Sequence, residues 1–336
     1  MRIVAPAGNC EHVLDLLESS PSATNVIYLP GAARKPEGDV ILCDVAREDA
    51  SVLVSDLREL NIDTEGSIAI EHIDSAISAV AAAAEKAAHG HPGDAVVWEE
   101  VEARTSENIE LNGVFLAFMA LACMIASVGI FLDSPILIVG SMIVGPEFGP
   151  LAGLCVALVQ RRRDVAKRSL RALAIGFPVG IAAAFALALV IRAVDLTPEG
   201  FVVGEHPLTD FISHPDAFSA IVAVIAGCAG VLSLTSAKSG ALIGVLVSVT
   251  TIPAAANVGV AAAFTEWDEF GGALLQLGVN LTGITLAGVA TLFVQRRLYI
   301  RRRRAHLDDA AREKAGLPLG RSRRGPASEP EKVAGQ

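Results

Sequence analysis

Six long apolar stretches constrain the fold of this chain more than any other feature. Each holds 17 to 26 residues and few charges, and a helix of about 20 apolar residues crosses the roughly 30 Å hydrocarbon core of a bilayer. In hydrocarbon, backbone polar groups are satisfied only within a helix or a closed barrel. We therefore predict a helical transmembrane domain over residues 109–295, with spans at Leu111–Leu132, Pro135–Val159, Leu170–Val194, Phe218–Leu234, Ser239–Phe264 and Gly271–Val294.

The flanking segments differ from these stretches in charge. Residues 1–110 hold 21 acidic and 7 basic residues, whereas the tail from Arg296 holds 12 basic and 5 acidic residues. We predict a cytoplasmic domain at 1–74, a helical linker at 75–108 and a basic, largely disordered cytoplasmic tail at 296–336. The simplest role for the arginines at 301–304 is to anchor the last span to anionic lipid.

The N-terminal segment has the pattern of a small α+β sandwich. The β-branched runs "NVIYLP" and "DVILCDVA" predict two strands, and the full order is strand, helix, strand, strand, helix, strand. That order is typical of a ferredoxin-like or ACT-like fold. Such a domain either binds a regulatory ligand or serves only structure and assembly, and the pattern leaves both alternatives open.

Loop charges predict the orientation of the spans. The loop after the second span is "QRRRDVAKR" and the segment after the sixth is "QRRLYIRRRR". The loop after the third span is acidic, with Glu199, Glu205 and Asp210 among its residues, and the loop after the fifth is "TEWDE". Because basic loops stay in the cytoplasm, we predict a multi-pass protein of the cell inner (cytoplasmic) membrane with both termini cytoplasmic. The first 20 residues have no apolar region of signal-peptide type.

The spans repeat at an offset of 104 residues. At this offset "IVGSMIVGPEFGPLAG" aligns with "LIGVLVSVTTIPAAAN", and both halves contain three spans with a broken middle span. A unit with an odd number of crossings places its copy in the opposite orientation. We therefore predict two inverted three-helix repeats, a design in which the binding site lies where the broken helices meet.

The broken helices carry the candidate site. Pro146 and Pro150 lack N–H groups, so the carbonyls one turn earlier lose their helical donors. Glu147 lies at the middle of its span, where an ionised carboxylate costs about 2.5–3.5 kcal/mol or more. Either the acid is protonated and purely structural, or it faces a polar cavity and supplies charge to a cation or proton site. The candidate substrate- or ion-binding residues are Glu147, Gly145, Pro146, Ser141, Thr250, Thr251, Asn257 and Asn280.

The sequence contains no catalytic motif that we recognise, so we expect no enzyme, no catalytic residue, no cofactor and no metal site. The favoured function is a membrane transporter or channel for a small solute or ion, with the N-terminal domain serving regulation or assembly. The alternative is a membrane-anchored sensor or scaffold whose soluble domain binds a ligand or a partner. The expected partners are the lipid bilayer, a small solute or cation, and further copies in a homo-oligomer, but no nucleic acid.

The segment "ASVGIFLDSPILIVGSMIVGPEFGPLAG" resembles a bacterial and archaeal membrane family, domain of unknown function 389. The resemblance extends from Trp98 to Val294 and rests on the Asp-Ser-Pro and Gly-Pro-x-x-Gly-Pro motifs. It implies a polytopic protein, often with a soluble N-terminal domain, and no established activity. Many members carry an apolar residue at the position of Glu147, which implies that a role of this glutamate is confined to a subset.

The predicted topology places residues 205 and 302 on opposite sides of the membrane. We expect cysteines that replace Glu205 and Arg302 to react with an impermeant thiol reagent from opposite sides, because one lies in an acidic loop and the other in a basic one. Labelling of intact and inverted vesicles measures this. Labelling of both sites from the same side would contradict the topology.

Overall fold

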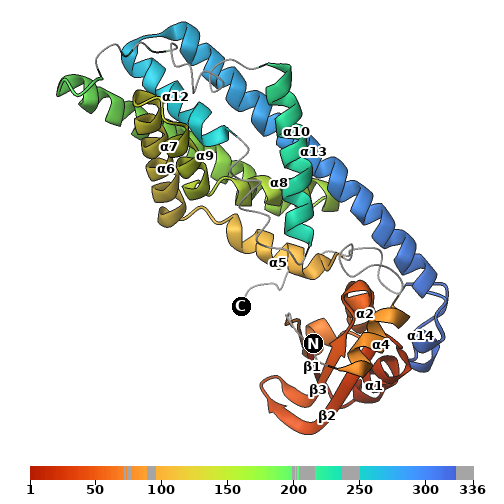
Figure 1. Cartoon of the computed structure of the whole chain (residues 1–336). Helices are drawn as coiled ribbons and strands as arrows, with labels where there is room; N and C mark the ends of the chain where they lie inside the picture. The colour runs from red at the N-terminus through yellow and green to blue at the C-terminus, as the bar shows by residue number, and fades with distance from the viewer. Residues whose placement is uncertain are drawn as a thin grey trace. The chain divides into compact units, whose positions relative to one another are not determined.

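The computed structural model describes residues 1–71, 73, 78–88, 96–198, 201, 203, 216–236 and 250–322, with the side chains of residues 107 and 108 left out. The chain divides into two compact units. One contains Met1–Val101 and Gln295–Gln336, and the other contains Glu102–Val294 (Figure 1). The first unit therefore combines the two ends of the chain, which the sequence had assigned to separate regions.

The first unit contains an antiparallel sheet that, in the described residues, has four strands in the order β2-β3-β1-β4. Ile3 and Ile41 lie opposite each other in the register of β1 and β3, and both side chains are buried. They pack with the apolar side of α1, whose Leu16 and Leu17 are also buried. The elements are β1 (Arg2–Ala5), α1 (Cys10–Ser19), β2 (Ala23–Arg34), β3 (Glu37–Val45), α2 (Arg47–Glu59), α3 (Ile62–Glu65) and β4 (Ser67–Ala69).

Two further helices follow the sheet, α4 (Ala79–Ala87) and α5 (Trp98–Asn108). Ser78 caps α4, because its side chain accepts a hydrogen bond from the backbone N–H of Ala81. The predicted linker at 75–108 is therefore helical in these two parts, whereas residues 74–77 and 89–95 lie outside the described residues.

The C-terminal segment is folded through Ser322, which corrects the prediction of a largely disordered tail for that part. Helix α13 (Trp267–His306) is followed by α14 (Ala310–Lys314). Arg312 is completely buried and its Nη2 atom lies 2.9 Å from Glu59 Oε2. Arg303 Nη2 lies 2.7 Å from Glu59 Oε1. Residues 323–336 of the predicted tail lie outside the described residues.

The physical reason is the presence of two buried carboxylates on α2. Asp56 and Glu59 are 0% and 4% exposed, and buried charges require partners. Arg312 pairs with both, and His306 Nε2 lies 2.7 Å from Asp56 Oδ2. Residues 1–74 alone would leave these carboxylates without their cations, so a domain ending at residue 74 omits part of the fold. Arg303 forms an ion pair with Glu59 inside this unit, which corrects the prediction that it anchors the last span to lipid.

The second unit consists of helices that suit a membrane. In the described part, four helices are long and apolar enough to cross one: α6 (Gly113–Phe131), α9 (Arg163–Ala193), α10 (Ala217–Thr235) and α13. The pair α7 (Pro135–Val144) and α8 (Phe148–Gln160) is bent by 55° and counts as a fifth span if taken together. The predicted span at Ser239–Phe264 corresponds to α12 (Thr251–Phe264), which has 14 residues, while residues 239–249 lie outside the described residues.

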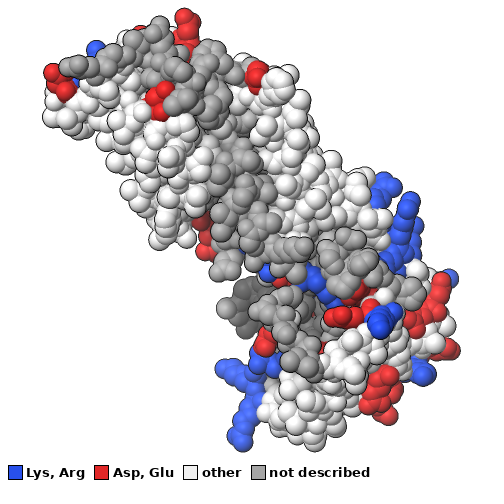
Figure 2. All heavy atoms as spheres, viewed as in Figure 1, with Lys and Arg blue, Asp and Glu red and all other residues white. Residues whose placement is uncertain are grey.

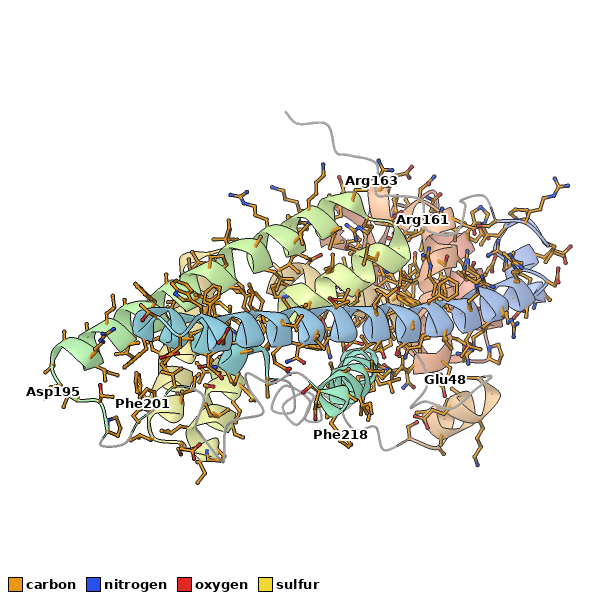
Figure 3. The ribbon with its side chains drawn as sticks, turned by 90° about the horizontal axis from the view of Figure 1, so that it is seen from above. Glu48, Arg161, Arg163, Asp195, Phe201 and Phe218 are labelled. Carbon is orange, nitrogen blue, oxygen red and sulfur yellow. The ribbon has the colours of Figure 1, made fainter. Side chains whose placement is uncertain are left out.

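Charged residues gather at the ends of these helices. Helix α9 begins at Arg163, beside Arg161, and Asp195 follows its last residue at the far end, while α13 runs in roughly the opposite direction (Figure 3). Arg192 Nη1 donates to the carbonyl of Ala263, which brings the end of α12 to the Asp195 end of α9. Between the ends, the visible face of the helices carries almost no charge (Figure 2). The arginines at the start of α9 and Asp195 beyond its last residue therefore lie at opposite ends of the helix.

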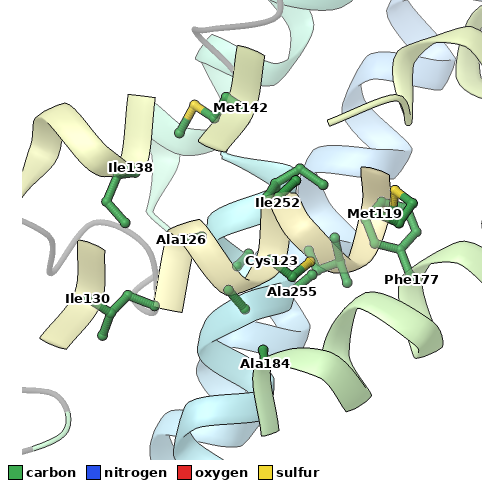
Figure 4. Close-up of a cluster of buried hydrophobic side chains, with 14 of the residues drawn as sticks. Met119, Cys123, Ala126, Ile130, Ile138, Met142, Phe177, Ala184, Ile252 and Ala255 are labelled. Carbon is green, nitrogen blue, oxygen red and sulfur yellow. The ribbon is translucent and has the colours of Figure 1, made fainter. Parts of the chain in front are cut away.

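Small residues hold the helices of the second unit close together. Gly259 of α12 lies against the backbone of Ile181 in α9, so closely that an added Cβ would stand 2.6 Å from the Ile181 carbonyl oxygen. Close backbone approach at small residues is the usual way in which membrane helices associate. Figure 4 shows the resulting core, with Cys123 and Ala126 of α6, Ala184 of α9 and Ala255 of α12.

We expect Arg312→Ala to destabilise the first unit by about 3–5 kcal/mol, because it leaves the buried carboxylates of Asp56 and Glu59 undercompensated. Arg304→Ala removes an exposed arginine from the same segment and serves as the control. Thermal unfolding of the full chain, with limited proteolysis of the tail, measures the difference. Equal behaviour of the two variants would show that the tail does not depend on these ion pairs.

Candidate functional site

The site begins at the break between α7 and α8. The last bond of α7 runs from the N–H of Gly145 to the carbonyl of Ser141, and Glu147 occupies the cap position before α8. Pro146 cannot donate a hydrogen bond back to Met142, which explains why the helix stops here. The break therefore places a carboxylate at the start of a new helix inside the apolar unit.

A second helix starts at the same place. Thr250 precedes α12, and Pro253 lies in its first turn, where its missing N–H costs nothing. Thr251 Oγ1 donates a hydrogen bond of 2.7 Å to Glu147 Oε1, and both residues are buried at 1% and 4% exposure. The two predicted breaks therefore meet in space, although 104 residues separate them.

The second carboxylate oxygen of Glu147 is unsatisfied. Oε2 is buried, and no donor reaches it within the part of the chain that the structure describes. Gly145 and Ile252 enclose it, because a Cβ added to Gly145 would collide with Oε2 and stand 2.7 Å from Ile252 Cγ1. Glycine at 145 thus makes room for the carboxylate, and a buried acceptor without a donor points to a bound group.

A polar chain extends the site toward α13. Asn280 Nδ2 donates to Thr250 Oγ1 at 2.9 Å, and Gln276 Nε2 donates to Asn280 Oδ1 at 3.3 Å. Gln276 is 1% exposed and its Oε1 has no donor among the described residues. The sequence analysis placed Asn280 in the site but not Gln276, although their spacing of four residues already put both on one face of a helix.

No hydrogen bond joins two of the predicted site residues to Glu147 in the described structure. Ser141 is buried in α7, and its hydroxyl donates to the carbonyl of Ile138 within the same helix at 2.6 Å. Asn257 is 5% exposed inside α12, and no hydrogen bond joins it to the site in the described structure. Among the predicted residues, Gly145, Pro146, Glu147 and Thr251 lie at the junction, and Thr250 and Asn280 are bonded to each other beside the start of α12.

The helix boundaries around this site recur at the same offset of 104 residues. Helix α6 (Gly113–Phe131) and helix α10 (Ala217–Thr235) correspond at both ends. Their cap residues Asn112 and Asp216 also correspond, and each side chain accepts a hydrogen bond from the backbone N–H three residues on. Helices α8 and α12 both end in a left-handed residue at corresponding positions, Arg161 and Thr265.

Contacts between helices recur in the same way. Cys155 of α8 lies against Gly288 of α13, and at the offset the partners become Gly259 of α12 and Ala184 of α9, which also touch. An added Cβ at Gly288 would stand 2.9 Å from Cys155 Sγ, and one at Gly259 would stand 2.8 Å from Ala184 Cβ. Helix α8 therefore packs against α13, and helix α12 packs against α9 in the corresponding way.

The oxygen atoms around the junction determine which groups can bind there. It presents carboxylate, hydroxyl and amide oxygens, which suit hard cations rather than soft transition metals. No group of three or more His, Cys, Asp or Glu residues able to hold a metal occurs among the residues that the structure describes. The unsatisfied atoms are acceptors, so a group bound here carries positive charge or donates hydrogen bonds.

Comparison with known proteins identifies one matching family model. Residues 142–286 match the family described as "Domain of unknown function (DUF389)", which confirms the resemblance noted from the motifs for that segment. An uncharacterized protein of Methanocaldococcus jannaschii is 24% identical over 202 residues, which cover 58% of each of the two chains. The chain therefore matches little more than half of the length of this relative. No solved structure matches.

We expect Gly145→Ala to lower the free energy of unfolding of the second unit by about 1–3 kcal/mol, because the added methyl group collides with Glu147 and Ile252. Gly140→Ala is the matched control, since a Cβ at this position in the same helix meets no atom within 4 Å. Alanine favours a helix over glycine by about 1 kcal/mol, so this control should be neutral or stabilising. Similar unfolding midpoints for both variants would refute the close enclosure of Oε2.

Proposed function

Because residues 142–286 belong to the DUF389 family, whose description names no activity, we propose a function from the geometry: this multi-pass membrane protein is a transporter or channel for a small ion or solute. One observation carries the proposal. Glu147 is buried where the break between α7 and α8 meets the start of α12, and its Oε2 atom has no donor among the described residues. In membrane proteins, an ionisable residue inside the apolar region usually marks a pathway.

The energetics favour a bound group over a purely structural acid. In the described structure, Thr251 is the one side chain that donates to the buried carboxylate, which therefore lacks most of the hydration that it has in water. A structural role would be expected to satisfy both oxygens, because an unsatisfied buried acceptor costs about 1–3 kcal/mol and more if it is charged. The free oxygen has a use if a cation, a proton or a donor group occupies the junction for part of the working cycle.

We also propose that the unit consists of two inverted three-helix repeats. The recurring boundaries of α6 and α10, the corresponding caps Asn112 and Asp216, and the corresponding contacts of Cys155 and Gly259 support this. The opposite directions of α9 and α13 fit the inversion (Figure 3). In inverted repeats, rocking of one half against the other opens a central site alternately to each side.

The first unit is proposed as a regulatory or assembly domain of ferredoxin-like or ACT-like class, supported by its strand order β2-β3-β1-β4 and by its two principal helices α1 and α2. The proposal includes a homo-oligomer, a location in the inner membrane and cytoplasmic termini, and no enzymatic activity. Thr251 and Glu147 do form a hydroxyl–carboxylate pair, but a nucleophile and base also need a group that orients the base.

A specific observation favours the sensor or scaffold as a second candidate. In the first unit, Glu48 is 4% exposed, and neither of its carboxylate oxygens has a partner in the described structure. Burial raises the pKa of Glu48. The indole Nε1 of Trp98 is also buried without a partner in the described structure. The backbone N–H of Trp98 donates to the hydroxyl of Ser51, which lies three residues after Glu48 in α2. A small polar ligand that satisfies the Glu48 carboxylate would give the unit a sensing role.

We expect Glu147→Gln to abolish flux while leaving expression and thermal stability nearly unchanged, because the amide keeps the shape and removes the charge. Proteoliposomes that contain the full chain, loaded with a pH-sensitive or Na⁺-sensitive dye, measure flux down proton, Na⁺ and K⁺ gradients. Glu110→Gln removes an exposed carboxylate from the same unit and is the control.

Two other results separate the candidates. If Glu147→Gln transports like the parent, the glutamate is a structural acid and the pathway lies elsewhere. If the parent shows no flux but a metabolite stabilises it through a Glu48-dependent shift in unfolding temperature, the protein is a sensor.

A further inference from the structure

We propose that the group bound at the junction of Glu147 and Thr251 is a single monovalent cation in competition with a proton. The inference rests on the proposed transport function and specifies its substrate class. It excludes divalent ions and anions from the site and assigns Thr251 as the residue that corresponds to Glu147 in the other half of the chain.

The net charge of the junction determines the valence of the ion that it can hold. In the described structure, Glu147 is the one carboxylate at the junction and its hydrogen-bond partner Thr251 is neutral. The hydrogen-bonded chain beside the start of α12, formed by Thr250, Asn280 and Gln276, is also neutral. Helices α8 and α12 both begin here, and each helix start adds up to roughly half an elementary positive charge. A divalent ion would leave a large uncompensated positive charge in a medium of low dielectric constant. A monovalent ion leaves a small one.

The unsatisfied atoms determine the sign of the charge on the bound group. Glu147 Oε2 and Gln276 Oε1 are acceptors, and each is buried without a donor in the described residues. The Thr251 hydroxyl gives its proton to Glu147 Oε1 and therefore offers only lone pairs to a further group. An anion at Glu147 would face the carboxylate and the lone pairs of Thr251, whereas a cation is attracted by both.

The same features limit how tightly the ion is held. The positive ends of α8 and α12 oppose a cation, whereas the carboxylate attracts it. Conduction and transport both require a site that binds well enough to fill and weakly enough to empty. A single carboxylate, partly offset by two helix starts, meets that requirement better than a site with two carboxylates would.

Glu147 and Thr251 occupy corresponding positions and contact each other, which makes their exchange informative. If an approximate two-fold axis relates the two halves, then two corresponding residues that touch each other lie next to that axis, one on either side. Swapping the two residues therefore returns one carboxylate and one hydroxyl to nearly the same place. Adding a carboxylate without removing one, as in Thr251→Glu, doubles the negative charge and should change the preferred valence.

The test is cation-dependent thermal unfolding of the purified full chain in detergent, with NaCl, LiCl, KCl, MgCl₂ and CaCl₂ compared against choline chloride at equal ionic strength. We expect at least one monovalent cation, and neither divalent cation, to raise the unfolding midpoint of the parent. The rise should weaken as the pH falls, because a proton on Glu147 removes the charge.

The variants make the assignment specific. Glu147→Gln should reduce the apparent affinity for the monovalent ion by about tenfold to hundredfold, and the double variant E147T/T251E should restore it. Thr251→Glu should gain a response to Mg²⁺ or Ca²⁺. If the double variant does not fold, Thr251→Val and Thr251→Ser replace it, since removal of the hydroxyl should weaken binding while serine should retain it.

Failure of this inference is distinguishable from failure of the proposed function. Stabilisation of the parent by divalent ions to the same extent would overturn the valence and leave the site in place. Flux that depends on Glu147 without any shift by a monovalent cation would overturn the cation and leave a transporter of protons or neutral solutes. A cation response that Glu147→Gln does not change would remove the junction as the site.

Discussion

The structure of the apolar unit depends on one constraint. A helix that is interrupted where no water is present must find hydrogen-bond partners for its exposed backbone and for any polar side chain at the break. Here the hydrogen bond from Thr251, at the start of α12, satisfies one oxygen of Glu147 at the break and leaves the other without a donor in the described structure. Glycine at 145 allows the approach. The close seams of α9 with α6 and α12 then keep the two helix starts together.

The sequence predicts the parts of this arrangement that have local causes. Pro146 and Pro150 break a helix wherever they occur, and the offset of 104 residues is visible in the apolar pattern. The meeting of Glu147 with Thr251 followed from these two observations taken together. Gln276 was not predicted as a site residue. A glutamine four residues before an asparagine also occurs on helices whose polar side chains serve only packing, so the spacing does not indicate a site.

The fold of the first unit was predicted less completely, for a physical reason. The strands follow from alternation and turn residues, which act over a few positions. The pairing of Asp56 with Arg312 joins residues 256 positions apart, and nothing near Arg312 in the sequence distinguishes it from an exposed arginine of a basic tail. A buried ion pair of this kind depends on complementary positions that local periodicity does not encode, so composition alone suggested disorder.

The near-equivalence of the two halves has an energetic consequence at its centre. Under the proposed inverted repeat, two identical halves would make the state open to one side of the membrane equivalent, by the two-fold rotation, to the state open to the other, and the two would have the same free energy. Glu147 in one half and Thr251 in the other remove that equality where the halves touch. In the proposed transport cycle, the resting population of the two states would then depend on which helix start the carboxylate favours, and a proton or an ion on its free oxygen would shift the balance.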